Sequence, residues 1–253
     1  MPRYALLLEY DGGAFQGWQR QSNGPSVQQV LEENAAPLNA GETARAIAAG
    51  RTDSGVHALG QVAVITLAAA MPPEKLRMAL NFHLKPWPVV IRAAAMAAPG
   101  WSPRFDATQR AYRYRILNRP TRAALDAGRV WHIPHMLDAE AMHRAATTLL
   151  GRHDFSAFRA ASCQAKSPIR TMEVLAVRRE AEEIIIEAEA RSFLHHQIRN
   201  LAGTLAEVGR GRRPEHWPRD VLEGLDRALG GQTAPPDGLC FMRVDYAEPI
   251  DWR

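Results

Sequence analysis

A short polar loop between two apolar segments carries residue types that could do chemistry. It runs Gly50-Arg51-Thr52-Asp53-Ser54-Gly55-Val56-His57-Ala58-Leu59-Gly60. Glycine allows the backbone to approach a ligand closely, and loops held by regular structure often carry binding and catalytic groups. A carboxylate such as Asp53 can act as a general base or as a nucleophile. The loop is therefore a candidate catalytic site.

Two other interpretations of this loop stay open from the residues alone. Asp53-Ser54-Gly55 is typical of an Asx turn, in which the carboxylate accepts a hydrogen bond from its own backbone, and spacing alone favours that turn over catalysis. A hydrolase with Ser54 as nucleophile and His57 as base is the other alternative. It is the weaker one, because the Gly-x-Ser-x-Gly pattern of a nucleophile elbow is missing.

The histidines elsewhere in the chain suggest metal ligands at first sight. His195 and His196 are adjacent, and His153 precedes Asp154. We expect residues 195–208 to be helical, so the two adjacent histidines would point to different sides of a helix. No cysteine or carboxylate cluster with metal-ligand spacing accompanies them. The sequence therefore predicts no metal site.

The composition describes an ordinary globular protein. The chain has 253 residues, of which 46% are apolar and 23% charged, which excludes disordered and fibrous chains and allows one large domain or two small ones. Its two cysteines, Cys163 and Cys240, cannot form a disulfide framework or a four-ligand zinc site. No apolar run is long enough to cross a bilayer, and the first residues lack a signal-peptide pattern. We therefore expect a cytoplasmic protein.

The basic residues are concentrated in two segments. The net charge is only +4, with an isoelectric point near 9.4. Residues 104–122, however, hold six arginines against one acid, and residues 191–213 hold five against one. Two basic stripes of this kind suit a polyanionic partner such as nucleic acid.

Hydrophobic periodicity and turn signals predict the same order of elements twice. In the first part we expect strands at residues 4–10, 44–49, 61–67 and 89–97 and helices at 26–40 and 72–84. In the second part we expect strands at 110–117, 171–177, 183–190 and 240–246 and helices at 138–150, 195–208 and 221–229. Each part follows the order of the ferredoxin-like split unit. The prediction is an α+β fold of two ferredoxin-like (split βαβ) halves with antiparallel or mixed sheets, residues 1–105 and residues 106–253, the second with an extra helix.

Five motifs in order along nearly the whole chain resemble the tRNA pseudouridine synthase A family. They are Gly50 to Val62; Arg104-Phe105-Asp106-Ala107 with Arg110-Ala111-Tyr112-Arg113-Tyr114; Gly151 with His153-Asp154-Phe155 and Phe158-Arg159; Phe193 with His195-His196-Gln197-Ile198-Arg199-Asn200; and Gly238-Leu239. The departures are small. Ser54 stands where alanine is common in the family, and Ser102-Pro103 stands where a His-Ala or Asp-Ala pair is expected.

The resemblance implies an RNA-modifying isomerase that needs no cofactor. Its substrate would be tRNA, at the uridines of positions 38–40 in the anticodon stem-loop. The uracil is detached from C1′ through N1, turned and rejoined through C5. The family also implies a homodimer. Within each chain, the sheets of the two ferredoxin-like halves would join into one continuous sheet, with the active-site cleft between these halves.

The resemblance also assigns roles to single residues. Asp53 would be the essential carboxylate, and Arg199 would pair with it. Tyr112 would lie against the target base, and Leu239 would border the uracil pocket. Arg51 would fill the space left by the extruded nucleotide.

The remaining assignments concern the RNA backbone. Arg104, Arg110 and Arg113 are predicted to contact phosphates, which position RNA without reading its sequence. From pattern alone, Tyr112 and Leu239 could equally be core residues and Arg199 a solvated one. A non-catalytic RNA-binding protein would share the basic stripes and the aromatic side chains, but it would have no need for Asp53.

Overall fold

The structure is a computed structural model that describes all residues from Met1 to Arg253. Contacts divide the chain into a first unit, Met1–Arg110 with Phe241–Arg253, and a second unit, Ala111–Cys240. The ten strands belong to one mixed sheet. This confirms the predicted α+β fold with a single joined sheet. The chain from Phe241 onward belongs with the first unit, whereas the prediction of halves 1–105 and 106–253 stays a prediction.

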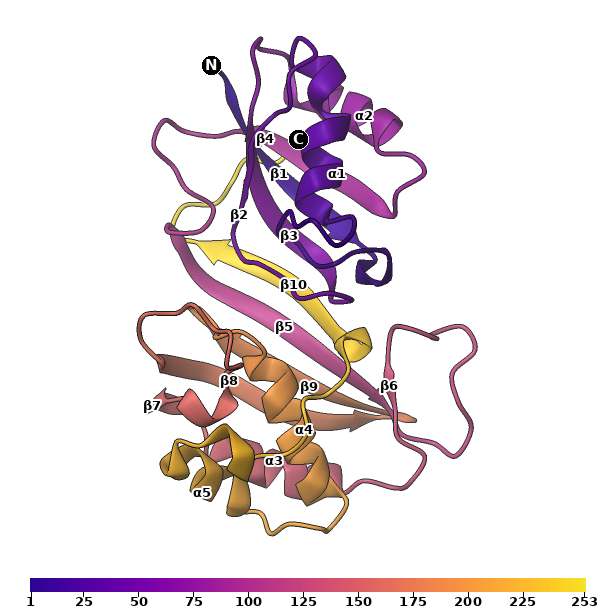
Figure 1. Cartoon of the computed structure of the whole chain (residues 1–253), viewed down its shortest axis with the longest axis vertical. Coiled ribbons are helices and arrows are strands. Elements are labelled where there is room, and N and C mark those ends of the chain that lie inside the picture. The colour runs from indigo at the N-terminus through magenta and orange to yellow at the C-terminus, as the bar shows by residue number, and fades with distance from the viewer. The chain divides into compact units, whose positions relative to one another are not determined.

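The first unit contains the elements expected for its half of the sequence. They are β1 (Arg3–Tyr10), α1 (Val27–Asn34), β2 (Ala46–Ala48), β3 (His57–Thr66), α2 (Pro73–His83) and β4 (Val89–Met96). Strand β1 lies between β3 and β4 and pairs antiparallel with both, while β2 pairs with β3 (Figure 1). Leu6 and Leu8 of β1 and Leu76 and Leu80 of α2 are fully buried. This core fixes the strand ends between which the polar loop lies.

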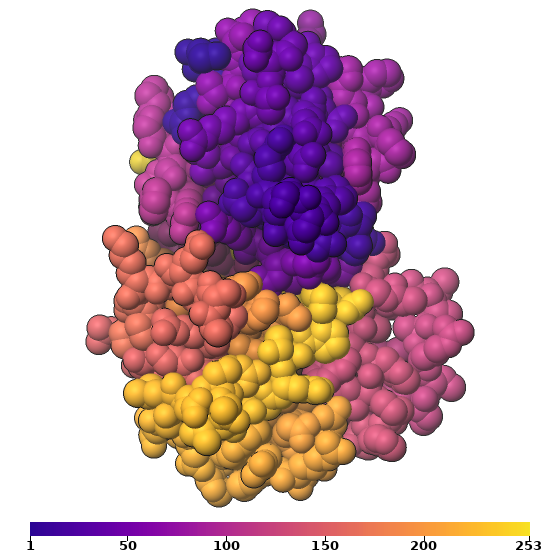
Figure 2. Space-filling view, viewed as in Figure 1, coloured from indigo at the N-terminus to yellow at the C-terminus, as the bar shows by residue number.

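Except for two strands whose residues are divided between the two units, the second unit holds the remaining elements. They are β5 (Ala107–Leu117), β6 (Trp131–His132), α3 (Ala139–Thr147), β7 (Gly151–Asp154), β8 (Ile169–Glu180), β9 (Glu183–Ala190), α4 (Gln197–Gly209), α5 (Trp217–Gly224) and β10 (Leu239–Tyr246). β5 starts and β10 ends with residues of the first unit. β8 pairs antiparallel with β7 and β9. Helices α3, α4 and α5 lie together (Figure 1), and the loop between β5 and β6 stands out from the rest of this unit (Figures 1 and 2).

Helix α1 is shorter than the predicted helix of residues 26–40. Its start is as expected, because the Ser26 side chain accepts the N–H of Gln29 at 3.2 Å. The helix ends at Asn34 and is followed by a short 3-10 turn, Ala36–Leu38. Pro37 explains the end, because it has no N–H to donate and disfavours a helical residue before it. The helical spacing of apolar residues extends to Leu38, but the α-helix cannot continue through Pro37.

The strand after the polar loop begins earlier than expected. We predicted a strand over residues 61–67, but β3 starts at His57, and Ala58 pairs with Tyr10 of β1. The loop is therefore Gly50 to Val56, called the Asp53 loop below. The longest helix, α4, has 13 residues, and none of the helices could span a membrane.

Candidate active site

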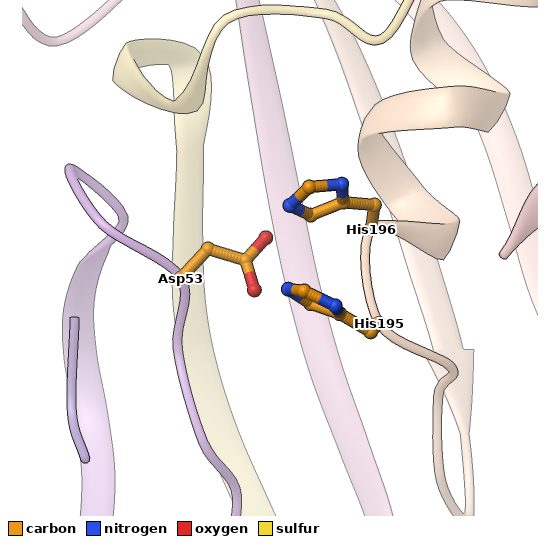
Figure 3. Close-up of side chains that lie close together, drawn as sticks. All are labelled: Asp53, His195 and His196. Carbon is orange, nitrogen blue, oxygen red and sulfur yellow. The ribbon is translucent and has the colours of Figure 1, made fainter. Parts of the chain in front are cut away.

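The Asp53 loop ends in a tight turn. The N–H of Val56 donates to the carbonyl oxygen of Asp53 at 3.1 Å. Gly55, inside this turn, has φ +79°, a conformation that favours glycine. Asp53 is half-buried, and Figure 3 shows its side chain extending from the loop. The turn thus holds a carboxylate at the point where the chain enters β3.

The Asx-turn interpretation does not describe this turn. An Asx turn would direct the Gly55 N–H to the Asp53 carboxylate. The Gly55 N–H instead donates to the carbonyl oxygen of Phe15 at 3.3 Å. The main chain closes the turn, so the Asp53 side chain is not required for the turn to form.

The segment after β1 packs closely against the Asp53 loop, main chain against main chain. The N–H of Trp18 donates to the carbonyl oxygen of Thr52 at 3.0 Å, and the Tyr10 and Thr52 hydroxyls are hydrogen-bonded at 2.8 Å. Gly17 has φ +87°, and a Cβ atom there would lie 2.6 Å from the Thr52 carbonyl oxygen. A larger residue than glycine would therefore push this segment away from the loop.

The hydrolase alternative lacks its geometry. A serine nucleophile needs its base within hydrogen-bond distance. The Ser54 hydroxyl lies 3.3 Å from the Phe15 carbonyl oxygen and 3.2 Å from Oε1 of Gln16. His57 Nδ1 accepts the Gly12 N–H at 3.0 Å. Ser54 and His57 are thus occupied by different partners.

Tyr112 lies on β5 and is 9% exposed. Its ring meets the ring of Phe193 edge to face, with centroids 5.2 Å apart and planes at 84°. Edge-to-face packing fixes the orientation of an aromatic ring. Tyr112 is therefore held as part of an aromatic pair, an arrangement consistent with both a core role and a stacking role.

Arg199, near the start of α4, is anchored by the chain that leads to β10. Its Nε donates to the carbonyl oxygen of Ala234 at 2.8 Å, and the Ala234 N–H donates to the Arg199 carbonyl oxygen at 3.1 Å. The Tyr114 hydroxyl donates to the next carbonyl, that of Pro235, at 2.8 Å. Burial raises the pKa of Tyr114 far above its usual value, and the charge of Arg199 opposes that rise. The guanidinium is thus fixed beside a neutral phenol.

Leu239 begins β10 and is 5% exposed. Gly238 precedes it, and a Cβ atom there would lie 2.6 Å from the carbonyl oxygen of Arg115 on β5. Glycine is therefore needed for the chain to come this close to β5. This close approach fixes the position of Leu239.

The arginines predicted to contact RNA occupy different environments. Arg51 and Arg104 are exposed, and the Arg104 guanidinium lies 5.6 Å from the centroid of the Phe105 ring. Arg113 is half-buried and forms an ion pair with Glu187 at 3.1 Å. Arg110 is buried, 7% exposed, and donates to the carbonyl oxygens of Ala49 and Arg104. Arg110 therefore differs from the other three arginines in being buried.

His195 and His196 differ from the sequence expectation. Helix α4 begins at Gln197, and His196 before it has φ +63°, in the left-handed region. The two side chains lie next to each other (Figure 3), and their ring centroids are 4.1 Å apart. The expected helical geometry, which would direct the two histidines to different sides, is wrong because α4 begins after them. Two adjacent imidazoles offer two nitrogen ligands, and the absence of a metal site stays a prediction.

The sequence did not assign a role to several residues that brace this site. Tyr10, Gln61 and Phe193 contact site residues that are distant in the chain, and the hydrogen bond between Tyr10 and Thr52 spans 42 positions. One signal was available. Gln61 is a polar residue at the start of an apolar run, and it is fully buried. A buried amide in a strand must hydrogen-bond to something, which indicates a structural network.

Comparisons with known proteins show the family to which the chain belongs. The model of the family described as tRNA pseudouridine synthase matches residues 7–106 and 145–247. The chain therefore belongs to the tRNA pseudouridine synthase family, as its motifs indicated, and it is an isomerase. This identification sets aside both the non-catalytic RNA-binding protein and the hydrolase.

Relatives at high identity agree along the whole chain. The tRNA pseudouridine synthase A of Acidiphilium cryptum is 57% identical over 247 residues, 97% of each chain. That of Rhodospirillum centenum is 54% identical over 250 residues, 97% of this chain and 100% of the relative. That of Gluconobacter oxydans is 48% identical over 248 residues, 97% of this chain and 90% of the relative.

Proposed function

We propose that the protein converts uridine to pseudouridine at positions 38–40 of the tRNA anticodon stem-loop, with Asp53 as the essential carboxylate. The observation that carries this proposal is the Asp53 loop. It presents a carboxylate from a turn that the main chain closes without it, with the N–H of Val56 on the Asp53 carbonyl at 3.1 Å. The bond that closes the turn uses the main chain of Asp53, so it does not tie the side chain to the turn.

The reaction is an isomerisation and balances without a second reactant. The bond between C1′ and N1 breaks, the bond between C1′ and C5 forms, C5 loses a proton and N1 gains one. A carboxylate can contribute as a nucleophile, at C1′ or at C6, or as the base that removes a sugar proton. Each route requires Asp53 to be ionised when the substrate binds. Enclosing the site raises the pKa of a carboxyl group unless an opposite charge offsets the rise.

Arg199 is the proposed source of that charge. Its Nε is anchored on the carbonyl of Ala234 at 2.8 Å, so its side chain has a fixed direction. Tyr112 would lie against the target uracil, and Leu239 would border the pocket for that base. Arg51, exposed at the start of the Asp53 loop, would fill the space that the flipped nucleotide leaves.

The finer statements about the RNA and the assembly are also proposals. Arg104 would contact the RNA backbone, which suits recognition of tRNA by shape rather than by base sequence. The same role for Arg113, which is paired with Glu187, stays a prediction. A homodimer, a cytoplasmic location and a cleft between the two halves as the active site remain predictions. Light scattering of the purified protein tests the dimer directly, because a dimer scatters as twice the mass of the chain.

Mapping pseudouridine in cellular tRNA tests the reaction, the substrate and the position together. In cells that lack the protein, pseudouridine should disappear from positions 38–40 and remain elsewhere. A wild-type copy should restore it, and a copy with Asp53→Asn should not. Loss of pseudouridine from another position, or none at all, would refute the proposed substrate site.

A further inference from the structure

Arg110 is a buried cation that binds the chain just before the Asp53 loop. Its Nε and Nη2 donate to the carbonyl oxygen of Ala49 at 3.1 and 2.7 Å, and Nη2 also donates to the carbonyl oxygen of Arg104 at 2.7 Å. Charge-assisted hydrogen bonds of this kind are stronger than neutral ones. A buried charge is costly unless it is hydrogen-bonded. The guanidinium is therefore directed at main-chain oxygens inside the first unit.

A second buried side chain holds the next residue of the loop. Gln61 on β3 is fully buried. Its Nε2 donates to the carbonyl oxygen of Gly50 at 2.8 Å, and its Oε1 accepts the N–H of Val62 at 3.2 Å. Two successive carbonyls, those of Ala49 and Gly50, thus point at side chains from two different strands.

The remainder of the loop is held in the same manner. The Thr52 hydroxyl is hydrogen-bonded to Tyr10 at 2.8 Å, and the Gly55 N–H donates to Phe15 at 3.3 Å. Asp53 lies between these two fixed points. The position of its carboxylate thus depends on a backbone held from both ends of the loop.

We propose that Arg110 is a positioning residue for Asp53 and not a contact to RNA. The proposal rests on the proposed role of Asp53. A displacement of about 1 Å at a reacting group can cost a factor of about 100 in rate. Arg110, 7% exposed, is enclosed by the protein, whereas a phosphate contact needs an accessible guanidinium. The guanidinium of Arg110 donates two hydrogen bonds to the Ala49 carbonyl oxygen from two nitrogens in a fixed plane, so a lysine ammonium cannot replace it.

The test compares Arg110→Gln and Arg110→Lys with the wild-type enzyme. We expect both variants to lose at least about tenfold in kcat, in proportion to the displacement of Asp53. The Kd for tRNA and its dependence on salt should stay unchanged. The contrary result is weaker tRNA binding by Arg110→Gln with a salt slope smaller by about one, restored by Arg110→Lys, at full kcat.

A matched variant separates positioning from general stability. Arg179 on β8 also donates to a main-chain carbonyl, that of Leu137, at 2.7 Å, but in the second unit. Arg179→Lys should lower the melting temperature and leave kcat unchanged. If Arg110→Gln does not fold, Gln61→Leu removes the neighbouring hydrogen bond to Gly50 and should lower kcat in the same way. Full kcat in folded Gln61→Leu and Arg110→Lys would overturn the inference.

The outcome for Asp53→Asn keeps the two proposals apart. If Asp53→Asn is inactive while the Arg110 variants keep full kcat, the positioning role is wrong and the role of Asp53 stands. If Asp53→Asn is active, the proposed function itself fails.

Discussion

At the residue scale, what distinguishes Asp53 is that the backbone around it is fixed by other groups. The turn is closed by the Val56 N–H at 3.1 Å, and the Gly55 N–H is directed to Phe15 at 3.3 Å. Neither bond uses the carboxylate. Replacing a carboxylate that caps its own turn destabilises the turn, whereas the two bonds named here do not depend on the Asp53 side chain. The loss of activity on changing Asp53 would therefore report on chemistry.

Ser54 gives a prediction that separates the isomerase from a hydrolase. Ser54 is exposed, and its hydroxyl lies near Phe15 and Gln16, at 3.3 and 3.2 Å. We expect Ser54→Ala to form pseudouridine at close to the wild-type rate, because exposed substitutions usually change stability by no more than about 0.5 kcal/mol. The measurement is the rate of pseudouridine formation in tRNA. An inactive Ser54→Ala would give that hydroxyl a catalytic role and contradict the account.

The sequence indicated the candidate catalytic residue Asp53, but it did not indicate the residues that hold its loop in place. Asp53 was noticed from its polar neighbours and glycines, and its proposed role came from the family resemblance. Arg110 was assigned to RNA because a run of arginines looks like a basic surface. Its actual partner, Ala49, is 61 positions away in the chain. Spacing cannot show that a strand residue will be buried against a loop formed so much earlier.

At the scale of elements, α4 and the chain that leads to β10 form one braced structure. The N–H of Gly231 donates to the Thr204 hydroxyl at 3.0 Å, and the Thr233 hydroxyl donates to Oδ1 of Asn200 at 2.7 Å. Together with the bonds between Arg199 and Ala234, these contacts fix the helix end that carries the proposed partner of Asp53.

Gly203 in α4 tests how closely that chain packs on the helix. A Cβ atom there would lie 1.7 Å from the main-chain oxygen of Gln232. We expect Gly203→Ala to lower the free energy of unfolding by about 1–3 kcal/mol, because backbone cannot move aside as a side chain can. Denaturant unfolding measures the loss.

Gly209→Ala in the same helix is the matched control. A Cβ atom at Gly209 would lie 2.6 Å from the sulfur of Met142, a flexible side chain. Alanine also has the higher helix propensity, by about 1 kcal/mol. Gly209→Ala should therefore cost less than Gly203→Ala, and equal losses would show that the close approach to Gln232 is unimportant.

Cross-strand ion pairs at Glu187 on β9 give a prediction for pH. Hydrogen bonds from Arg178, at 2.6 Å, and from Arg113, at 3.1 Å, lower the pKa of Glu187 below its ordinary value of 4.5. A lowered folded-state pKa stabilises the fold above the unfolded-state pKa. That contribution is lost as the pH falls through the folded-state value.

Unfolding of the wild type and of Glu187→Gln at neutral pH and at about pH 3 tests this linkage. We expect the wild type to lose more stability on acidification than Glu187→Gln, because the glutamine has no proton to take up. If the two proteins lose the same amount, the ion pairs at Glu187 do not contribute.

Long periodic elements were predicted better than short ones. Leu76 and Leu80 marked α2, and both are fully buried as expected. Strands β6 and β7, with 2 and 4 residues, were missed, because so short a segment shows no alternation. The predicted helix over residues 221–229 lies partly in α5, which ends where Leu225 adopts φ +55°. A left-handed leucine is a tertiary result that local propensity does not indicate.

At the scale of the whole molecule, the fold changes the meaning of the basic stripes. Within residues 104–122, Arg115 pairs with Glu183 at 2.6 Å and Arg119 pairs with Glu182 at 2.7 Å. Arg113 pairs with Glu187, and Arg110 is buried. Much of this stripe is therefore neutralised by acids that are distant in sequence. A count of arginines overstates the charge that RNA would meet.

The salt dependence of tRNA binding tests this reduced surface. Binding should weaken as salt rises, because phosphate contacts release counterions. Arg104→Gln should reduce the slope of log affinity against log salt by about one. Arg115→Gln, which removes a paired arginine, should leave the slope unchanged. An equal reduction by both variants would mean that the paired arginines also contact the RNA backbone.

The central claim is that Asp53 carries out the chemistry of the isomerisation, and release of tritium from tRNA labelled at C5 of uridine tests it most directly. C5 must lose its hydrogen when it is joined to C1′, so each turnover releases one label into water. We predict that Asp53→Asn is folded, binds tRNA with wild-type affinity and releases no tritium above background. Release near the wild-type rate by that variant would contradict the account.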